Sequence, residues 1–569
     1  MTPNSPPPTD GETHESESKS QASDLVEIAK QAELFADPHD ERAYASIEVN
    51  GHRETWAVRS KQFRAWLGET FYRLRGRAIN SAALHDAINV VTGMALYDGS
   101  QWPVYVRVAG DGGRIYLDLC DDRWQVVEVA SNGWHAIESR ACPVRFTRRR
   151  GMLPLPEPQR GGSVDDLRPL INVASDADWR VLVAFMVACL RPQGPYPVLA
   201  VNGEQGSAKS TLSRMVRGVI DPNVSPLRRP PKGDRDLMIA ATNSWITAFD
   251  NLSGVSANLS DALCSLTTGG GFATRELHTD DEEKLFTAQR PVLLNGIDEV
   301  ATRPDLLDRA ICLTLPVIPP HQRQDEESLR AQYERLRPGI LGALLDAVSA
   351  ALLNLPNVRL SRSPRMADFA KWATAAEPGL KWKGGAFMAA YDSNREAAND
   401  LAIEASVTGS AVLALMSRHH KWEGTSGEIL AEIEKHHASP AQRARQGWPR
   451  SPKAMSQALR RLAPNLRAAG IEYHAPTPQG KDRRRILILE KVTSQLFAPF
   501  TSSATAGLEL PRVDVPHESE PTADGQADAP PPHPPPSTQS GTVGTADASA
   551  ADETDEPFLT QPESEISLW

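Results

Sequence analysis

The chain has 569 residues and 40% hydrophobic content, which is enough for three or four domains with proper cores. Its net charge of -11 comes from the ends: residues 501–569 hold thirteen acids against one base and residues 1–24 hold five against one, which leaves 25–500 at +5. Five scattered cysteines without a CxxC pair argue against a disulfide framework or a zinc site. The N-terminus has no signal-peptide pattern and the longest apolar run is ten residues, so we expect a soluble cytoplasmic protein with no membrane segment.

The first part of the chain predicts a disordered tail and then a separate domain. Residues 1–23 are polar, acidic and proline-bearing, a composition that predicts disorder. Residues 24–150 combine a short helix, a hairpin around Asn50-Gly51, two further helices and a run of alternating strands. This pattern predicts an N-terminal α+β domain.

Three acids in this domain, Asp118, Asp121 and Asp122, admit two interpretations. They are either metal-binding acids of a primase-type polymerase or the polar end of a strand. Such a metal site usually needs two acids on one strand face, two residues apart, whereas Asp118 and Asp121 are three apart. The spacing therefore favours a strand end followed by a turn.

The central stretch of the chain reads as a strand, a glycine-bearing loop and a helix. A proline- and glycine-rich linker over 151–162 comes first, and a helix capped by Ser175 follows. Val198 to Val201 then form a short buried strand, and a helix starts at Lys209. We assign 163–320 to a nucleoside triphosphatase core.

The loop of this core has the composition of a phosphate-binding loop. Its backbone N–H groups are expected to surround a phosphate, while Lys209 reaches the β- and γ-phosphates and the Ser210 hydroxyl binds Mg²⁺. Ala208 stands where the usual pattern has a second glycine, and its methyl group restricts the backbone slightly. An ordinary strand–helix turn is the alternative. The residues expected to bind ATP are Gly203, Glu204, Gln205, Gly206, Ser207, Ala208, Lys209, Ser210 and Thr211.

A second apolar strand ends in Asp250, which is expected to hold the Mg²⁺ ion through its water shell. The next residue is Asn251, where a second acid usually orients the attacking water. An amide does not accept a proton from water at pH 7. Either Glu204, Asp298 or Glu299 serves as the base, or hydrolysis is slow.

A third apolar strand ends in Asn295, a candidate to contact the γ-phosphate or the attacking water. Arg309 follows the segment after this strand. It is either an arginine finger that reaches the nucleotide of the next subunit in a ring or a partner of Asp305 or Asp308. The order and spacing of these elements favour the finger.

Two loops of the core also carry bases. The segment from Thr268 to His278 contains three glycines, Arg275 and His278, and is expected to be either a hairpin facing the pore of a ring or a plain surface turn. The proline-rich loop 225–235 carries four bases, which contact nucleotide, a neighbouring subunit or DNA, or are simply solvated.

Residues 321–400 predict helices, among them 326–336 and 339–354, which form a lid or a subunit-packing element. Residues 401–492 have the element order of a winged helix: a helix over 401–419, a second over 425–436, a third opened by Ser451-Pro452, and a hairpin.

Eleven bases against two acids between 443 and 489 favour nucleic-acid binding over a winged helix used only for protein contacts. The residues expected to contact DNA are Arg275, Lys453, Arg460, Arg461, Lys481, Arg483 and Arg484. The last part, 493–569, is an acidic proline-rich tail expected to be disordered, and its apolar tip is either a docking peptide for a replication partner or a solubilising end.

These motifs, taken in order, resemble the superfamily 3 helicase domain of phage, plasmid and poxvirus primase-helicases. The similarity rests on Gly203 to Thr211, Phe249-Asp-Asn, Thr268-Gly-Gly with Arg275-Glu-Leu, Leu294-Asn295 and the Arg309 segment, and covers about 165–320. The resemblance implies an AAA+-related ring, usually a hexamer, that couples ATP hydrolysis to movement along single-stranded DNA. It assigns the family's roles to Lys209, Ser210, Asp250, Asn295 and Arg309, while Ala208 and Asn251 depart from the family's pattern.

The fold expected is therefore multidomain α/β: a P-loop AAA+-like core with an N-terminal α+β domain, a helical segment and a C-terminal winged helix. The function expected is an ATP-dependent DNA motor of phage or mobile-element replication, with ATP and Mg²⁺ as cofactors. A slowly hydrolysing, ATP-gated DNA-binding switch is the first alternative, and a scaffold that recruits replication proteins through its tail is the second.

Overall fold

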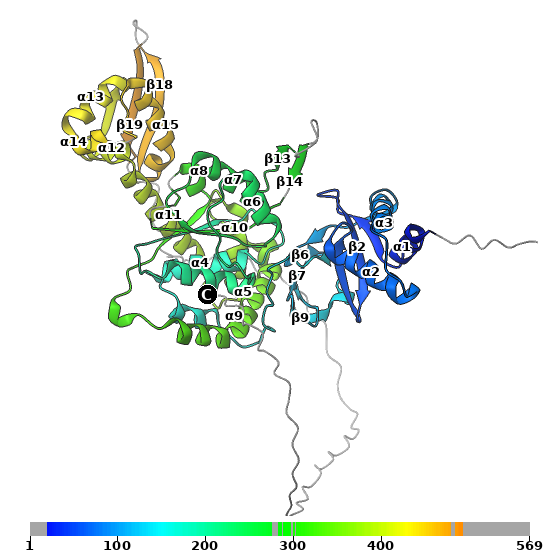
Figure 1. Ribbon diagram of the computed structural model, residues 1–569. Coiled ribbons are helices and arrows are strands. Elements are labelled where there is room, and N and C mark those ends of the chain that lie inside the picture. Colours follow the sequence, from blue (N-terminus) through cyan, green and yellow to red (C-terminus); the bar gives the residue numbers. More distant parts are fainter. Residues whose placement is uncertain are drawn as a thin grey trace, which may run out of the picture. The chain divides into compact units, whose positions relative to one another are not determined.

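The computed structural model describes residues 20–275, 283–286, 288–297, 300–301, 303–445, 447–479 and 484–492 (Figure 1). The segments expected to be disordered, 1–23 and 493–569, lie outside this range apart from residues 20–23. Residues 21–23 belong to the first helix, α1, which is capped by the Ser20 hydroxyl.

The first group of elements forms a four-stranded sheet with the strand order β3-β2-β1-β4, covered by helices. The hairpin predicted around Asn50-Gly51 is confirmed, with both residues at positive φ, as a tight two-residue turn requires. The apolar residues of this group form one hydrophobic cluster of their own. The elements are α1 (Gln21–Ala29), β1 (Glu33–Ala36), β2 (Ala43–Val49), β3 (His52–Ala57), α2 (Lys61–Arg75), α3 (Ser81–Gly93), the π-helix Met94–Asp98 and β4 (Ser100–Gln101).

The next strands form an antiparallel meander, β6-β7-β8-β9, beside a two-stranded pair of β5 and β10. Apolar residues of the meander belong to the same hydrophobic cluster as the central helices, and Trp134 donates a hydrogen bond to Asp346 at 2.8 Å. The segment 24–150 is thus divided among three hydrophobic clusters. The strands are β5 (Val104–Tyr105), β6 (Val108–Asp111), β7 (Arg114–Asp118), β8 (Gln125–Ala130), β9 (Gly133–Glu138) and β10 (Arg145–Phe146), with a 3-10 turn at Ser139–Ala141.

The proline- and glycine-rich segment 151–162 packs tightly against the central helix α9 (Glu326–Asn354). The Gln159 N–H donates to the Pro338 carbonyl at 2.9 Å, and Leu155 is buried. A side chain at Gly342 would overlap the Gln159 carbonyl, and one at Gly162 would overlap the Gly339 backbone. Two backbones therefore cross here at a distance that only glycine permits.

The centre of the chain is a parallel four-stranded sheet with the order β12-β15-β11-β16. Alternate residues of its strands enter two different clusters: Leu199 and Leu293 pack with α4, α5 and α9, whereas Ala200 and Leu294 pack with α6, α7 and α8. Both faces are buried, which explains why these strands are mostly apolar up to their carboxyl ends. The elements are α4 (Asp176–Ala188), β11 (Val198–Asn202), α5 (Lys209–Ile220), α6 (Asp234–Thr242), β12 (Thr247–Leu252), α7 (Ala257–Thr268), β15 (Val292–Gly296), α8 (Pro304–Leu307) and β16 (Ala310–Thr314).

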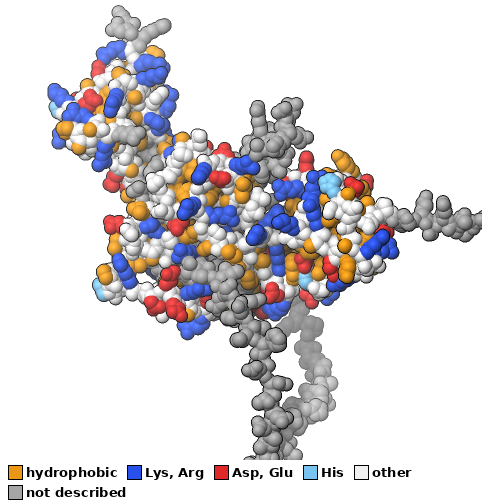
Figure 2. Space-filling model, in the orientation of Figure 1, with side chains coloured by type: hydrophobic (Ala, Val, Ile, Leu, Met, Phe, Trp, Pro, Cys, Tyr) orange, Lys and Arg blue, Asp and Glu red, His pale blue; other side chains and the backbone are white. Residues whose placement is uncertain are grey.

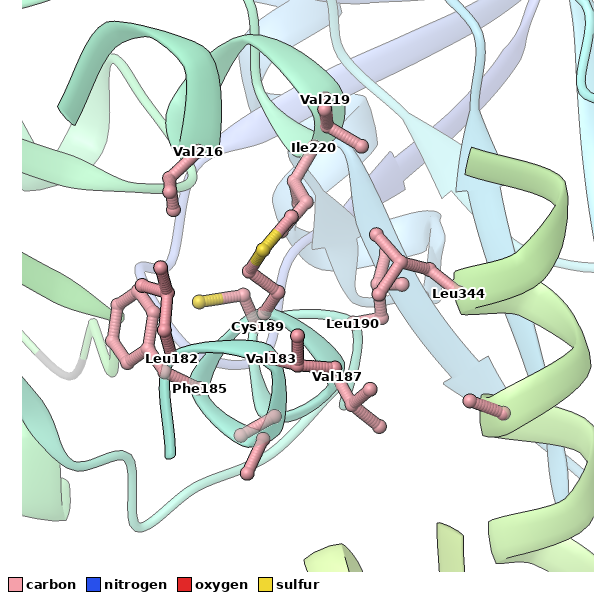
Figure 3. Packing of buried hydrophobic residues seen from close by; sticks show 14 of the residues in the cluster. Leu182, Val183, Phe185, Val187, Cys189, Leu190, Val216, Val219, Ile220 and Leu344 are labelled. Carbon is pink, nitrogen blue, oxygen red and sulfur yellow. The ribbon is translucent and has the colours of Figure 1, made fainter. Parts of the chain in front are cut away.

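Helix α4 is the centre of the larger cluster. Figure 3 shows Leu182 and Val187 of this helix, and Leu190 just after its end. They pack with Val216 and Ile220 of α5 and Leu344 of α9. Helix α4 has 13 residues, nine of which are buried, and it carries little charge after its first turn. The helix therefore packs in the same hydrophobic cluster as the strand that leads into the glycine loop.

The prediction of two helices over 326–336 and 339–354 is wrong, because α9 runs unbroken through Pro338. Proline removes one helical hydrogen bond, at a cost of about 3 kcal/mol. The apolar face from Ile340 to Ala351 is buried, and this packing outweighs the loss. By length and hydropathy α9 also resembles a membrane span, but its apolar residues lie in the protein core.

The last described part, 407–491, has its own hydrophobic cluster and a three-stranded sheet with the order β17-β19-β18. The helix predicted over 401–419 is divided at Ser406, which caps α12 through its hydroxyl. The elements from 367 on are α10 (Ala367–Ala376), α11 (Ala386–Ala405), α12 (Val407–Arg418), β17 (Lys421–Gly424), α13 (Ser426–His436), α14 (Pro440–Ala444), α15 (Pro452–Ala468), β18 (Ile471–Gln479) and β19 (Arg484–Lys491).

Candidate functional site

The glycine loop lies at the carboxyl end of β11 and leads directly into α5. Gly203, Gly206 and Ala208 all have positive φ, at 150°, 84° and 61°. This backbone turns successive N–H groups toward one side, next to the N-terminus of α5, and such a concave surface suits an anion. Ala208 occupies the left-handed region, so the strain there, on the order of 1 kcal/mol, is larger than the slight restriction expected from the sequence.

Lys209 is the first residue of α5, and its ammonium group lies over the loop. It donates to the carbonyls of Gly203 and Glu204 at 2.7 and 2.8 Å. Partial burial lowers the pKa of Lys209, and the carboxylate of Asp250 acts in the opposite direction. The cation is thus held at the mouth of the loop by backbone oxygens alone.

Ser210 and Asp250 come together although 40 residues separate them in the chain. The Ser210 hydroxyl donates to the two Asp250 oxygens at 3.1 and 3.4 Å. A hydroxyl and a carboxylate at the edge of a site are hard oxygen ligands, and this pair fits Mg²⁺ because that ion takes few protein ligands and keeps several waters. Among the described residues no group of three or more His, Cys, Asp or Glu side chains is placed to hold a metal ion, and a Mg²⁺ site of this kind needs none.

Asn295 connects the strand of Asp250 to helix α5. It is 1% exposed, accepts a hydrogen bond from the Asn251 N–H at 2.9 Å and donates to the Ser213 hydroxyl at 3.2 Å. Its amide has two N–H groups, so the bond to Ser213 uses one of them. Strand β15 lies between β11 and β12, which places Asn295 between the glycine loop and Asp250.

Asn251 adopts the left-handed conformation, with φ of 58°, at an irregularity in the pairing of β12 with β15. Its side chain is exposed. Asparagine tolerates this conformation better than glutamate, because its short side chain bonds locally. The backbone here therefore accounts for a short polar side chain, Asn or Asp, at this position. Of the alternative bases, Glu204 is exposed in the loop, and Asp298 and Glu299 lie outside the described residues.

A further residue of this site, which no motif in the sequence marks, is Asn172. Its amide donates to the carbonyls of Ser207 and Pro316, at 3.1 and 2.6 Å, and so joins the glycine loop to the segment after β16. Ser207 is also buried and donates to the Glu204 carbonyl. The loop is thus fixed at its centre, whereas Gln205 is exposed and Thr211 half-buried. No sequence pattern marks Asn172, because its partners are backbone atoms.

Arg309 lies at the opposite end of the sheet from the glycine loop. It precedes Ala310, which pairs with Val198 at the amino end of β11, whereas the loop follows Asn202. Four strand residues separate these ends by about 13 Å. Its guanidinium donates to the Asp305 carbonyl at 2.7 Å and is half-buried. Arg309 is therefore not part of its own chain's glycine-loop site.

The part with α12–α15 and β17–β19 carries a basic surface (Figure 2). Lys453, Arg460 and Arg461 are all exposed on α15, and among the described residues no carboxylate lies within ion-pair distance of them. Arg484 is exposed as well, but pairs with Glu428. Arg443, Arg445, Arg450 and Arg485 add to this surface and are likewise exposed. Lys481 and Arg483, like the side chain of Arg275, lie outside the described residues.

Two of the three acids considered for a polymerase-type site, Asp118 and Asp121, face the Arg148 guanidinium, at 2.9 and 3.9 Å. Asp118 is buried and accepts hydrogen bonds from the Cys120 N–H and the Arg148 guanidinium, each at 2.9 Å. Asp121 accepts from the Gln125 N–H at 2.8 Å, and Asp122 is exposed. Asp118 and Asp121 thus hold the turn between β7 and β8 together.

Comparison with solved structures gives low similarity. The structures titled "The apo structure of NrS-1 C terminal region (305-718)" and "The A form apo structure of NrS-1 C terminal region-CTR" are each 11% identical to the chain. The first match covers 83% of this chain and 100% of the other with a TM-score of 0.35, and the second covers 82% and 98% with 0.36. No curated protein gives a significant sequence match.

Family models give a clear assignment. Residues 164–401 match the model described as "Actinomycete integrative conjugative element replication protein", and residues 408–505 match the "AICE RepA C-terminal domain". The two matches together cover more than half of the 569 residues. They meet near the break between α11 and α12. The chain belongs to the RepA family of replication proteins of actinomycete integrative conjugative elements.

Proposed function

We propose that this replication protein is an ATP-dependent DNA motor whose core is of the P-loop, AAA+-related type. The observation that carries the proposal is the 3.1 Å contact between Ser210 and Asp250, beside Lys209 and the positive-φ loop. Three separate stretches of sequence supply these groups and Asn295 to one edge of one parallel sheet. That edge, outside the carboxyl ends of the strands, is where open α/β sheets bind their ligands.

Each residue has a specific task in this proposal. The loop backbone binds the phosphates, Lys209 neutralises charge on the β- and γ-phosphates, and Ser210 with Asp250 holds Mg²⁺. The bound ion supplies further charge neutralisation on the phosphates. Asn295 joins the two strands around the site, so a change at the γ-phosphate is transmitted to α5 through Ser213.

The position of Arg309 supports a ring as part of this proposal. The residue lies about 13 Å along the sheet from its own loop, so it acts on phosphate only if another subunit presents one. Head-to-tail packing of this kind closes into a ring, for which we propose a hexamer. The C-terminal part, with helices α12–α15 and a three-stranded sheet, is in this proposal of the winged-helix type, and its exposed arginines bind DNA phosphates.

The decisive experiment measures ATP turnover and unwinding of a forked duplex, with and without single-stranded DNA, for wild type, Lys209→Ala and Lys371→Ala. Lys371 is exposed on α10 and serves as the matched control. We expect turnover stimulated by DNA, abolished in Lys209→Ala and unchanged in Lys371→Ala. A wild-type protein that binds ATP and DNA without hydrolysis or unwinding would exclude a motor.

A second candidate, an ATP-gated DNA-binding switch, is favoured by Asn251. This amide stands where an acid would orient water, and its left-handed backbone suits Asn or Asp better than Glu. Asn251→Asp therefore tests the idea with less strain than Asn251→Glu. Slow wild-type turnover that rises severalfold in Asn251→Asp supports the switch, whereas fast wild-type turnover excludes it.

A further inference from the structure

The segment after β16 wraps around the glycine loop. The Leu315 N–H donates to the Asn202 carbonyl at 2.9 Å, and the Ile318 N–H approaches the Gly206 carbonyl at 3.5 Å. A 3-10 turn over Pro320–Gln322 then reverses the chain toward α9. The loop is consequently bordered on one side by residues 315–323 of the same subunit.

Arg323 ends this segment, and its guanidinium lies beside the middle of the loop. A Cβ atom built on Gly206 would lie 3.2 Å from Nη2 of Arg323 and 3.9 Å from its central carbon. The Nε atom donates to the Ile318 carbonyl at 3.3 Å, which directs the rest of the group toward the loop. Gly206 has a φ of 84°, so the arginine occupies the space where a side chain would otherwise stand.

The charge of Arg323 is also not neutralised by a neighbouring acid. The residue is exposed, and within the described ranges no Asp or Glu forms an ion pair with it. Two other arginines of the core differ in this respect: Arg303 is paired with Asp261 and Asp305, and Arg395 with Asp308. A free guanidinium next to an anion-binding backbone indicates that an anion is its partner.

We propose that Arg323 binds the phosphate chain of the nucleotide held by the loop of its own subunit. The inference rests on the proposed function and adds a phosphate-binding residue to it. Arg323 approaches from the carboxyl edge of the sheet and Arg309 lies at the amino edge, so the two arginines belong to different nucleotide sites. A guanidinium can donate two parallel hydrogen bonds to phosphate oxygens, which an ammonium cannot.

The test measures the affinity of the full chain for a non-hydrolysable ATP analogue and for AMP, for wild type, Arg323→Ala, Arg323→Lys and Arg359→Ala. Arg359 is an exposed arginine that likewise donates to backbone carbonyls of its own turn and serves as the control. We expect Arg323→Ala to weaken the ATP analogue about tenfold and AMP less than twofold, since the loss of one charge-assisted contact has this size. Arg323→Lys should restore part of the loss, and Arg359→Ala should bind as wild type.

Other results are equally informative. Equal weakening of the ATP analogue and AMP, together with a lower melting temperature without nucleotide, would make Arg323 a structural residue and overturn the inference. Unchanged affinity in Arg323→Ala, alongside loss of binding in Lys209→Ala, would overturn the inference and leave the nucleotide site intact. A wild-type protein that binds no ATP would instead remove the proposed function on which the inference rests.

Discussion

Charged side chains have opposite surroundings at the glycine-loop edge and on the basic surface of 407–491. At the loop edge, Lys209 and Asp250 are held by hydrogen bonds to backbone or to a neighbouring hydroxyl. On α15, Lys453, Arg460 and Arg461 are exposed and free of carboxylate partners among the described residues. The fixed groups of the first region suit the small ligand proposed for it, whereas the exposed cations of the second suit the extended ligand proposed there.

This difference predicts how each region responds to mutation. Groups with fixed positions act together, so the loss of one removes most of the function of the site. Exposed cations act through summed charge, so each contributes modestly and more strongly at low salt. Variants in both regions test this contrast.

The largest effect is expected from Asp250→Asn. The change keeps the size of the side chain but removes the charge opposite Ser210, so Mg²⁺ binding and turnover should fall about 10³-fold in the presence of DNA. Steady-state turnover measured over a Mg²⁺ titration checks this. The control is Asp400→Asn, an exposed residue at the end of α11. A loss below threefold in Asp250→Asn would contradict the assigned role.

Arg309→Ala should lower turnover at least 10²-fold, because the arginine completes the site of a neighbouring subunit. The activity of a mixture of two inactive variants is the more specific measurement. Inactive Lys209→Ala and inactive Arg309→Ala subunits should regain activity together, since some interfaces then combine an intact lysine with an intact arginine. If the mixture stays inactive while mixed rings are shown to form, Arg309 does not act between subunits.

The double variant Arg460→Glu and Arg461→Glu should weaken DNA binding more than tenfold at low salt and flatten its dependence on salt concentration. ATP binding should not change, because the glycine loop lies in a different hydrophobic cluster. Arg467→Ala is the matched control, since Glu472 already pairs with that arginine. DNA affinity that is unchanged in the double variant would place the nucleic-acid contacts elsewhere.

The smallest effect is expected from Ala208→Gly. Relief of the left-handed conformation should raise the free energy of unfolding by about 1 kcal/mol, measured by chemical denaturation. Ala331→Gly, in the middle of α9, should have the opposite sign, because glycine destabilises a right-handed helix by about 0.5–1 kcal/mol. The same sign in both variants would exclude strain at Ala208.

The sequence was sufficient to predict the elements of the glycine-loop edge. Apolar runs followed by a polar residue located β11, β12 and β15, and the loop pattern located the start of α5 at Lys209. The order of these strands across the sheet, which brings Asn295 between the loop and Asp250, was not predicted from spacing. Strand neighbours depend on the path of the chain, and a short apolar run does not encode that path.

Contacts to backbone atoms were also outside what the sequence predicts. Asn172 acts on the carbonyl of Ser207, and Asn251 has a positive φ, and neither property changes the pattern of apolar and polar residues. The meander β6–β9 illustrates the same limit. Alternation identified its strands, but not that one of their faces packs against α9, where Trp134 bonds Asp346, 212 residues further along the chain.

The glycine crossing between 159–162 and α9 determines how this protein can be dissected. A fragment cut at residue 163 would lose the Gln159–Pro338 hydrogen bond and Leu155, and would leave the apolar side of α9 without the meander that covers it. The smallest piece expected to fold alone therefore begins before β6 and ends after α11. Shorter motor fragments that start at the glycine loop should aggregate when expressed, whatever their capacity to bind nucleotide.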